Sequence, residues 1–191
     1  VGHVQKSRLL GRDRVQVGDR LIGLASSGLH SNGYSLVRRA LLERGGLSLD
    51  DSSALGEPLA DALLRPTRIY VQAVRALLDD PSLAGSVHAA AHITGGGLPG
   101  NLVRVLPTET TARIERTSVP SQPIFELIQE VGPVDDDEMW RVFNRGVGFV
   151  LVVAPEAADA VHKRLAAAGE TAFDLGEVER SGANSASVQL L

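Results

Sequence analysis

Residues 20–44 read RLIGLASSGLHSNGYSLVRRALLER, and this stretch carries the clearest fold signal in the chain. It opens with a short apolar run, Arg20 to Ala25, which a polar and glycine-containing segment follows. This pattern is typical of a buried strand that ends in a loop. From residue 35 onward the apolar residues fall on one helical face, until two glycines at 45 and 46 end the pattern. The stretch therefore predicts a strand, a polar loop and an amphipathic helix.

The same alternation continues along the rest of the chain. Short apolar runs predict strands at 87–93, 112–115, 148–153, 173–177 and 187–190, the last two as a closing hairpin with antiparallel character. Helical spacing predicts helices at 35–44, 67–78, 98–99, 123–131, 135–143 and 155–169. In the second of these, Thr67 is expected to cap a helix that buries Ile69, Val74 and Leu77. We expect one mixed α/β domain over residues 18–191, with residues 1–17 as a lead-in.

Composition narrows the classes of function. The 191 residues include 23 Asp and Glu against 19 Lys and Arg, a net charge of −4, and no cysteine. Without a basic stripe, nucleic acid is a poor candidate for a partner. No apolar run approaches the roughly 20 residues of a membrane helix, and the first residues lack the pattern of a signal peptide. The lack of cysteine excludes disulfides and thiolate metal sites and fits a reducing compartment, so we expect a cytoplasmic protein that binds no membrane.

The loop of residues 26–35 is the sharpest candidate for chemistry. Gly28 and Gly33 have the spacing of a Walker-type phosphate loop, but Tyr34 stands where that loop needs its lysine. What remains is an anion cradle, because flexible glycines, hydroxyl and amide side chains and free N–H groups precede a helix. The alternative is an ordinary Asn/Gly/Ser turn that only caps the helix.

A second candidate is the stretch HAAAHITGGG at residues 88–97. His88 and His92 share one strand face, but no third ligand completes a metal site, so we predict no metal here. His88 is better explained as a structural strand residue. His92 ends the strand beside Gly95, Gly96 and Gly97, at the place where ligands of α/β proteins gather. Three glycines allow a ligand to approach the backbone, although a tight strand-to-helix connection would need them as well.

Three further features are weaker. The loop after Asn144 is rich in glycine, yet such loops before strands are common. Arg68 could clamp a phosphate or carboxylate, although an arginine at this position is usually solvated. The run Asp135 to Glu138 is best explained as the acidic start of a helix rather than a Mg²⁺ site. Met139, Trp140 and Phe143 are expected in the core.

Five ordered blocks, at residues 26–38, 66–71, 88–97, 123–125 and 138–148, resemble the phosphoribosylformylglycinamidine cyclo-ligase (aminoimidazole ribonucleotide synthetase) family of purine biosynthesis. The resemblance covers the carboxyl-terminal half of that family, and residues 1–10 resemble the join between the halves. Two departures stand out: Val142 replaces a usual threonine, and Val119-Pro120 lies where the family often has a tryptophan.

The resemblance implies the family's carboxyl-terminal fold, a mixed sheet with packed helices that is distantly ferredoxin-like. It implies ATP-dependent ring closure of formylglycinamidine ribonucleotide, in a cleft between the two halves of a homodimeric enzyme. ATP and Mg²⁺ would be bound mainly by the amino-terminal half, and the present chain would supply the substrate side and be inactive alone. The site residues that the resemblance suggests are Ser27, Gly28, His30, Ser31, Asn32, Gly33, Arg68, His92, Thr94, Gly95, Gly96, Gly97 and Asn144, with His30 and His92 as the catalytic candidates.

Two alternatives stay open. One is a related ATP-dependent enzyme with the same two-half architecture, such as selenophosphate synthetase or thiamine-monophosphate kinase. The other is a binding domain that keeps a phosphate-ligand cradle without catalysis.

Overall fold

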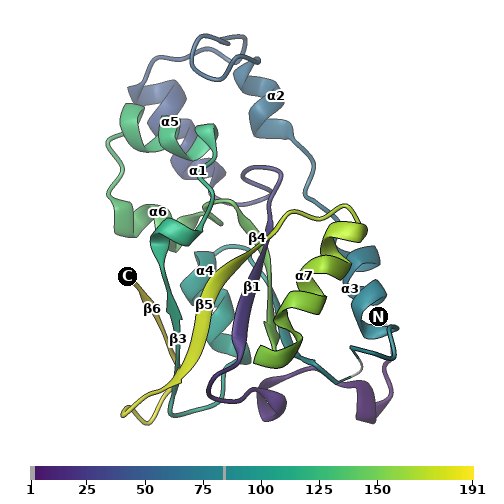
Figure 1. The fold of residues 1–191 in the computed structure, drawn as a ribbon. Coiled ribbons are helices and arrows are strands. Elements are labelled where there is room, and N and C mark those ends of the chain that lie inside the picture. The colour runs from purple at the N-terminus through teal and green to yellow at the C-terminus, as the bar shows by residue number, and fades with distance from the viewer. Residues whose placement is uncertain (1–2, 84) are drawn as a thin grey trace.

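The computed structural model describes residues 3–83 and 85–191, which fold into a six-stranded sheet with helices on both faces and at one end (Figure 1). The strands are β1 Arg20–Ala25, β2 Val87–His92, β3 Thr110–Ile114, β4 Val147–Val153, β5 Ala172–Arg180 and β6 Ser187–Leu190. The helices are α1 Tyr34–Val37, which continues as a π-helix over Arg38–Arg44, α2 Leu59–Leu64, α3 Val71–Leu78, α4 Gly97–Leu102, α5 Pro123–Val131, α6 Asp136–Val142 and α7 Ala158–Ala167. Single 3-10 turns form at Lys6–Arg8, Arg12–Arg14, Val103–Val105, Arg116–Ser118 and Pro155–Ala157.

The sheet is mixed, as the resemblance implied. Its strand order is β2-β4-β1-β5-β3-β6, and every pair is antiparallel except β3 and β6, which run parallel. The expected closing hairpin is wrong, because β3 lies between β5 and β6. A strand pairs with whichever neighbour completes its ladder, and short strands such as β6 do not reveal that neighbour in their own sequence.

Two apolar layers sandwich the sheet. Side chains alternate across each strand, so neighbouring residues of β4 enter opposite layers: Leu151 packs with α3 and α7, whereas Val150 and Val152 pack with α4. The two amphipathic helices α3 and α7 cover one face of the sheet, and α4 covers the other (Figure 1). Both layers consist mostly of aliphatic residues, in keeping with the 4% aromatic content.

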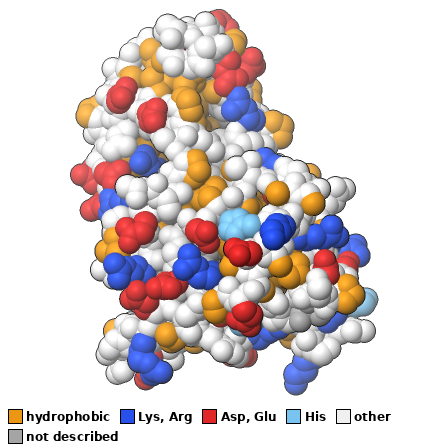
Figure 2. All heavy atoms as spheres, viewed as in Figure 1, with side chains coloured by type: hydrophobic (Ala, Val, Ile, Leu, Met, Phe, Trp, Pro, Cys, Tyr) orange, Lys and Arg blue, Asp and Glu red, His pale blue; other side chains and the backbone are white. Residues whose placement is uncertain are grey.

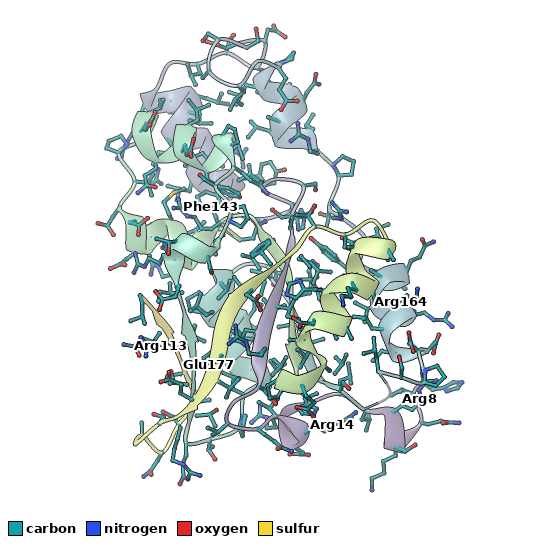
Figure 3. The ribbon with its side chains drawn as sticks, viewed as in Figure 1. Arg8, Arg14, Arg113, Phe143, Arg164 and Glu177 are labelled. Carbon is teal, nitrogen blue, oxygen red and sulfur yellow. The ribbon has the colours of Figure 1, made fainter. Side chains whose placement is uncertain are left out.

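A third cluster forms a helical cap at one end of the sheet, above it in Figure 1. It contains α1, the π-helix, α2, α5 and α6, and its core includes Leu29, Phe125, Met139 and Phe143. Figure 3 places Phe143 at the junction of cap and sheet. The prediction that Met139, Trp140 and Phe143 are core residues is confirmed, since they are 0%, 4% and 0% exposed.

The sequence pattern predicted most of the helices and strands; it missed α2, and two of its predicted helices differ in the structure. Strand β1 and helix α5 have the predicted bounds. The helix predicted from Thr67 begins only at Val71, and Ile69 is 77% exposed instead of buried. The segment before it is irregular and is held by contacts with the loop of residues 26–33; the Thr67 and Ser31 hydroxyls share a hydrogen bond of 3.1 Å, so Thr67 does not cap a helix.

The second error concerns the helix predicted over 35–44, most of which is a π-helix. Its wide turn ends where Gly45 N–H donates to Ala40 O at 2.9 Å. The π-helix packs closely on the end of α5: a Cβ added to Gly132 would lie only 2.4 Å from the Ala40 Cβ. This geometry depends on a neighbouring helix and leaves no mark in the periodicity.

The lead-in is tied to the body of the molecule. Its residues 1 and 2 lie outside the described part, and from residue 3 on it forms two 3-10 turns. Arg8, near the amino terminus in Figure 3, donates to Asp79 at 2.7 Å, and Arg14 donates to Gly85 O at 2.9 Å. The division into a lead-in of residues 1–17 and a domain of residues 18–191 stays a prediction.

Surface charges are interspersed on the face shown in Figure 2, where acidic and basic side chains alternate over the sheet and helices. Several face each other across strands, as Arg20 does with Asp174 at 3.6 Å and Glu177 at 3.8 Å. None of the described helices has the length and apolar character needed to cross a bilayer.

Candidate functional site

Strand direction brings the two glycine-rich loops together. Strands β1 and β2 both pair antiparallel with β4, which lies between them, so they run in the same direction. Their carboxyl ends therefore lie at the same end of the sheet, and each is followed by one loop. The chain of residues 66–70 passes beside them, which makes three segments that meet below the helical cap.

Residues 26–33 leave a series of main-chain amides without an internal acceptor. Within the described residues, Ser26 N–H and Ser27 N–H donate to Gly146 O and to His30, whereas no acceptor is found for the amides of Gly28 to Gly33. Gly28, His30 and Gly33 have φ values of 139°, 56° and 79°, so the chain turns sharply. Gly28 and His30 are buried, while Ser31 is exposed and Asn32 and Gly33 are half-buried. The part of the loop that a ligand can reach is residues 31–33.

Residues 94–97 form the second loop, and their three glycines differ in role. Gly95 and Gly96 are exposed, and their amides find no acceptor among the described residues. Gly97 is buried with φ +62°, and its N–H donates to Thr94 O at 3.1 Å. The two loops touch, since a Cβ on Gly95 would lie 3.4 Å from the Asn32 Oδ1. Residues of both loops whose amides have no acceptor among the described residues thus lie side by side.

The carboxyl end of α6 supports both loops. A Cβ on Gly33 would lie 2.2 Å from the Phe143 ring, and one on Gly97 would lie 1.9 Å from Trp140 O. Both glycines have positive φ, so a side chain is excluded by conformation as well as by space. Close packing on α6 fixes the distance between the loops.

The side chains of Asn144 and Ser27 make hydrogen bonds that hold the first loop. The Asn144 side chain is 2% exposed; it donates to Gly28 O at 2.8 Å and accepts from Gly146 N–H at 2.8 Å and from Ser26 Oγ at 3.0 Å. Ser27 Oγ donates to Pro66 O at 2.6 Å. These hydrogen bonds tie the first loop to the segment before β4 and to the segment before α3.

His30 is buried with a defined tautomer. Its Nε2 accepts from Ser27 N–H at 3.1 Å and from Arg68 N–H at 3.4 Å, so the proton of the neutral ring is on Nδ1. Nδ1 is buried and has no partner among the described residues. Burial, followed by the nearby charges of His92 and Arg68, lowers the pKa of His30 to about 4. The ring is therefore neutral near pH 7 and links the first loop to the segment before α3.

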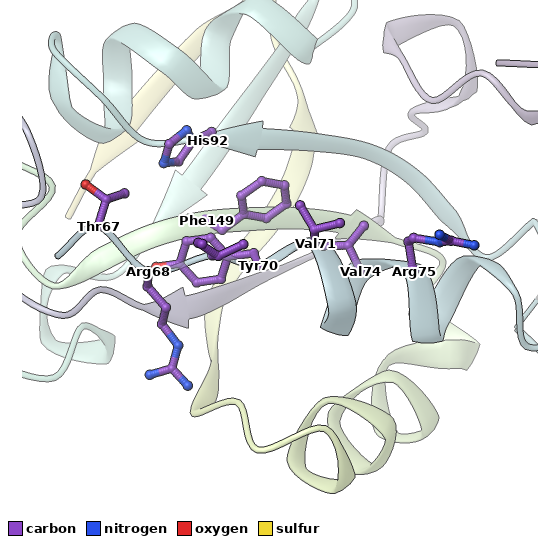
Figure 4. A pocket seen from close by; sticks show the side chains of 9 residues that line it. Thr67, Arg68, Tyr70, Val71, Val74, Arg75, His92 and Phe149 are labelled. Atoms are coloured by element: carbon purple, nitrogen blue, oxygen red, sulfur yellow. The ribbon is translucent and has the colours of Figure 1, made fainter. Parts of the chain in front are cut away.

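His92 ends β2 on the surface, beside an apolar cavity of about 450 Å³ (Figure 4). Its ring centroid lies 6.3 Å from those of His30 and Tyr70 and 6.2 Å from that of Phe149. The Tyr70 hydroxyl donates to Ala25 O at 2.8 Å, and burial raises the pKa of Tyr70. Of the two histidines that the sequence suggested, only His92 has an accessible ring.

The Arg68 side chain contacts Gly169 and Glu170. Its side chain extends away from His92 in Figure 4. Its Nη2 donates to Gly169 O at 3.0 Å, and its Nε lies 2.8 Å from Glu170 Oε2 as an ion pair whose angle falls short of a hydrogen bond. In this conformation the guanidinium does not face the two loops.

The remaining candidates have structural partners. His88 Nδ1 lies 2.7 Å from Asp19 Oδ2, as expected for a structural strand residue. Asp135 caps α6 by accepting from Asp137 N–H at 2.9 Å, and Arg116 pairs with Asp136 and Asp137, so the acidic run is the start of a helix. No group of three or more His, Asp or Glu among the described residues is placed to hold a metal ion.

Two side chains at the site were missed by the sequence analysis. Asn101, 4% exposed, donates to Gly97 O at 2.7 Å and to the carbonyls of Thr94 and Gly95 at 3.3 Å, and it accepts from Thr94 Oγ1 at 3.1 Å. Tyr70 forms one wall beneath His92. Asn101 could have been found from the sequence, because it is an asparagine four residues after Gly97 in an otherwise apolar helix. No feature of the neighbouring sequence indicated Tyr70.

Comparison with known proteins gives a family match over most of the chain. The model of the family described as AIR synthase related protein, C-terminal domain, matches residues 16–189. A phosphoribosylformylglycinamidine cyclo-ligase of Citrifermentans bemidjiense is 46% identical over 100% of this chain and 54% of its own length. One of Sorangium cellulosum is 49% identical over 95% of this chain and 52% of its own length. The chain therefore spans about half the length of the curated relatives it matches.

Solved structures share the fold. Thiamine-monophosphate kinase from Stenotrophomonas maltophilia K279a superposes with a TM-score of 0.61 at 22% identity, over 97% of this chain and 54% of that one. T. maritima PurL, complexed with AMPPCP, has a TM-score of 0.52 at 13% identity, over 93% of this chain and 24% of that one. At these identities the likeness concerns the fold alone. The family model and the two cyclo-ligase relatives establish that this chain belongs to the AIR synthase related family, of which it is a carboxyl-terminal domain.

Proposed function

We propose that the chain is the substrate-binding half of a phosphoribosylformylglycinamidine cyclo-ligase, which closes the imidazole ring of formylglycinamidine ribonucleotide in an ATP-dependent reaction. Relatives of that name match 95–100% of the chain. The observation that carries the proposal is the meeting of two glycine loops, whose solvent-accessible residues 31–33, 95 and 96 have amides without an acceptor among the described residues. An array of convergent N–H groups is the physical requirement for holding a phosphate.

The amides of residues 31–33, with those of Gly95 and Gly96, would bind the phosphate and ribose end of the substrate. Ser31 and Asn32 add a hydroxyl and a side-chain amide to the same surface, and Thr94 lies at its edge. Ser27, Gly28, Gly97 and Asn144 hold the loops in shape from below, as their internal contacts indicate. Arg68 would contact substrate only after leaving Glu170.

His92 is the better candidate for contact with the reacting end. It is exposed at the carboxyl end of β2, next to the second loop. His30 acts as a positioning residue, because its Nε2 already accepts two amides and its Nδ1 is buried. The nucleotide would supply the phosphoryl group that turns the formyl oxygen into a leaving group; an amidine nitrogen would then attack the formyl carbon, closing the ring as the carbon–oxygen bond breaks and phosphate leaves. The chain's part in this step is to hold the substrate in line.

ATP and Mg²⁺ would be bound mainly by an amino-terminal half of the same enzyme. We also propose that this half forms the interface of a homodimer, and that the enzyme is cytoplasmic. Use of ATP within the wider fold family is supported by a neighbour complexed with AMPPCP. The chain alone should therefore not turn over ATP. Vigorous turnover by the purified chain would contradict this division of the site, and sedimentation of the complete enzyme tests the dimer.

The site itself is tested by substitution in the complete enzyme. Ser31→Ala and Asn32→Ala should each weaken binding of the substrate nucleotide about tenfold or more, since a hydrogen bond to a charged group contributes about 1.5–3 kcal/mol. Asn184→Ala, in the exposed connection between β5 and β6, is the matched control. Isothermal titration calorimetry measures the affinities. Equal affinities in all three variants would refute the site, and binding without ring closure would favour the non-catalytic alternative.

A further inference from the structure

We propose that Glu170 is a positioning residue for the first loop, residues 26–33. Through the Arg68 guanidinium it fixes the segment of residues 66–70, against which that loop packs. The inference deepens the proposed function, because it rests on the first loop as a part of the chain that binds the substrate.

The Glu170 carboxylate is buried, which is rare for this type of side chain. Its side chain is 8% exposed, and among the described residues its one ion-pair partner is Arg68, whose Nε lies 2.8 Å from Oε2. Oε2 is buried and has no hydrogen-bond partner there. A single ion pair returns little or none of the free energy that it costs to remove both charges from water. Stability alone therefore explains this pair poorly, whereas the pair restricts where the guanidinium lies.

The turn that ends α7 holds Glu170 in place. The N–H groups of Gly169 and Glu170 donate to Ala166 O and Leu165 O, both at 3.0 Å. With Gly169 at a φ of 79°, these two hydrogen bonds form the Schellman motif that ends many helices. The next residue, Thr171, accepts an N–H from the end of β1 at 2.9 Å. The carboxylate thus projects from a turn whose backbone is tied both to α7 and to the sheet.

Arg68 connects this turn with the first loop. Its guanidinium contacts the turn twice, through the ion pair with Glu170 and through Nη2, which donates to Gly169 O at 3.0 Å. Its main-chain N–H donates to His30 Nε2 at 3.4 Å, on the side of the first loop. The side chain and the backbone of one residue therefore join the end of α7 to the buried histidine of the loop.

The residues before Arg68 contact the same loop. Pro66 O accepts from Ser27 Oγ at 2.6 Å, and the Thr67 and Ser31 hydroxyls share a hydrogen bond of 3.1 Å. Residues 66–70 have no regular secondary structure, so no helix or strand ladder of their own fixes their conformation. Once the guanidinium loses its anchor, the segment and the loop that packs on it should open more often.

Removing the charge of Glu170 separates this role from its opposite. If Glu170 only keeps Arg68 away from the substrate, Glu170→Gln in the complete enzyme frees the guanidinium and tightens binding of the substrate nucleotide. We expect the reverse: KM for this nucleotide rises about tenfold while kcat changes less than about threefold, because a positioning residue does not touch the reacting atoms. Tighter or unchanged binding, measured by isothermal titration calorimetry, would overturn the proposal.

A merely structural role is tested with Val161→Ala. Val161 is 0% exposed on the same helix, and its truncation destabilises α7 without removing the ion pair. Its affinity for the nucleotide should equal that of the parent enzyme. A loss of affinity equal to that of Glu170→Gln would mean that Glu170 acts only through the stability of α7, and would overturn the proposal.

Hydrogen exchange of residues 26–33 and 66–70, in the complete enzyme without nucleotide, gives a second readout. The amides of Ser27 and Arg68, which both donate to His30, should exchange about tenfold faster in Glu170→Gln and at the parent rate in Val161→Ala. Unchanged exchange in Glu170→Gln would contradict the proposal. This readout needs no substrate, so an enzyme that does not bind formylglycinamidine ribonucleotide would fail the proposed function and still test the role of Glu170.

A double-mutant cycle tests whether Glu170 acts through Arg68. Exchange and affinity are measured for Arg68→Gln, Glu170→Gln and the double variant. Because both changes break the same link, the double variant should be no more impaired than Arg68→Gln alone. Losses that multiply would show that the two residues act independently, and would overturn the proposal.

Discussion

Acidification should weaken the fold through one histidine. His30 is 3% exposed, and its Nε2 accepts two main-chain amides. Burial is the largest cause of its low pKa, about 4 against an ordinary value of 6.5, and His92 and Arg68 lower it further. The folded protein therefore resists protonation of this ring, while the unfolded chain accepts the proton at a higher pH.

The sign and size of the effect follow from linkage. Because the folded pKa lies below the unfolded one, His30 leaves stability unaffected above pH 6.5 and lowers it as the pH falls from 6.5 toward 4. Each pKa unit corresponds to about 1.4 kcal/mol, so the total reaches about 3 kcal/mol. Roughly 2 kcal/mol of this should be lost between pH 7 and pH 5.

Urea unfolding of the chain at pH 7, 6 and 5 measures this loss when the His30→Gln variant is compared with the parent. Glutamine keeps an acceptor for the two amides but does not titrate. The variant is expected to be less stable at pH 7, and the difference between the two proteins should shrink by about 2 kcal/mol at pH 5. His3→Gln, which removes an exposed histidine, is the control and should follow the parent. Parallel curves for His30→Gln and the parent would refute the reasoning.

Further predictions concern the support of the second loop. Asn101→Ala should cost about 1–3 kcal/mol in urea unfolding, because it removes the side-chain amide that donates to Gly95 O and Gly97 O and leaves Thr94 O with the Gly97 N–H alone; a loss under about 0.5 kcal/mol would contradict its role. Gly97→Ala should cost several kcal/mol, roughly 3 or more, since its Cβ would lie 1.9 Å from Trp140 O at positive φ. Gly100→Ala in the same helix meets no atom within 4 Å and should instead stabilise by up to about 1 kcal/mol. Thermal melts of the two glycine variants that shift in the same direction would refute the packing argument.

The helices and strands that the sequence predicted correctly are those that depend on interactions between residues close together in the chain. Strand β1 is a continuous apolar run that polar residues end, and α5 begins with a proline at its first position. Both follow from interactions within a few residues, so their bounds were predictable. The start of α3 was not, because Thr67 and Arg68 are held by a loop almost 40 residues earlier in the chain.

The same distinction applies to the candidate site. The sequence pointed to both glycine loops, since runs of glycine with serine, asparagine and histidine are unusual in their own right. It did not separate Asn144, which supports the loop from within, from Asn32, which lies at the surface. Nor did it separate His30 from His92, because burial and hydrogen-bond partners decide which ring is accessible.

From the sequence by itself came the order of the strands and of the helices other than α2, the two polar loops and the family, because periodicity, turn residues and ordered blocks are properties of the chain. Only the tertiary structure decided which strands are neighbours, and so that β1 and β2 run in the same direction with β4 between them. That arrangement sets Asn32 beside Gly95 and leaves Ile69 and Val71 on the surface. The physical reason is that contacts between distant segments depend on ladder pairing and close packing, which no short stretch of sequence encodes.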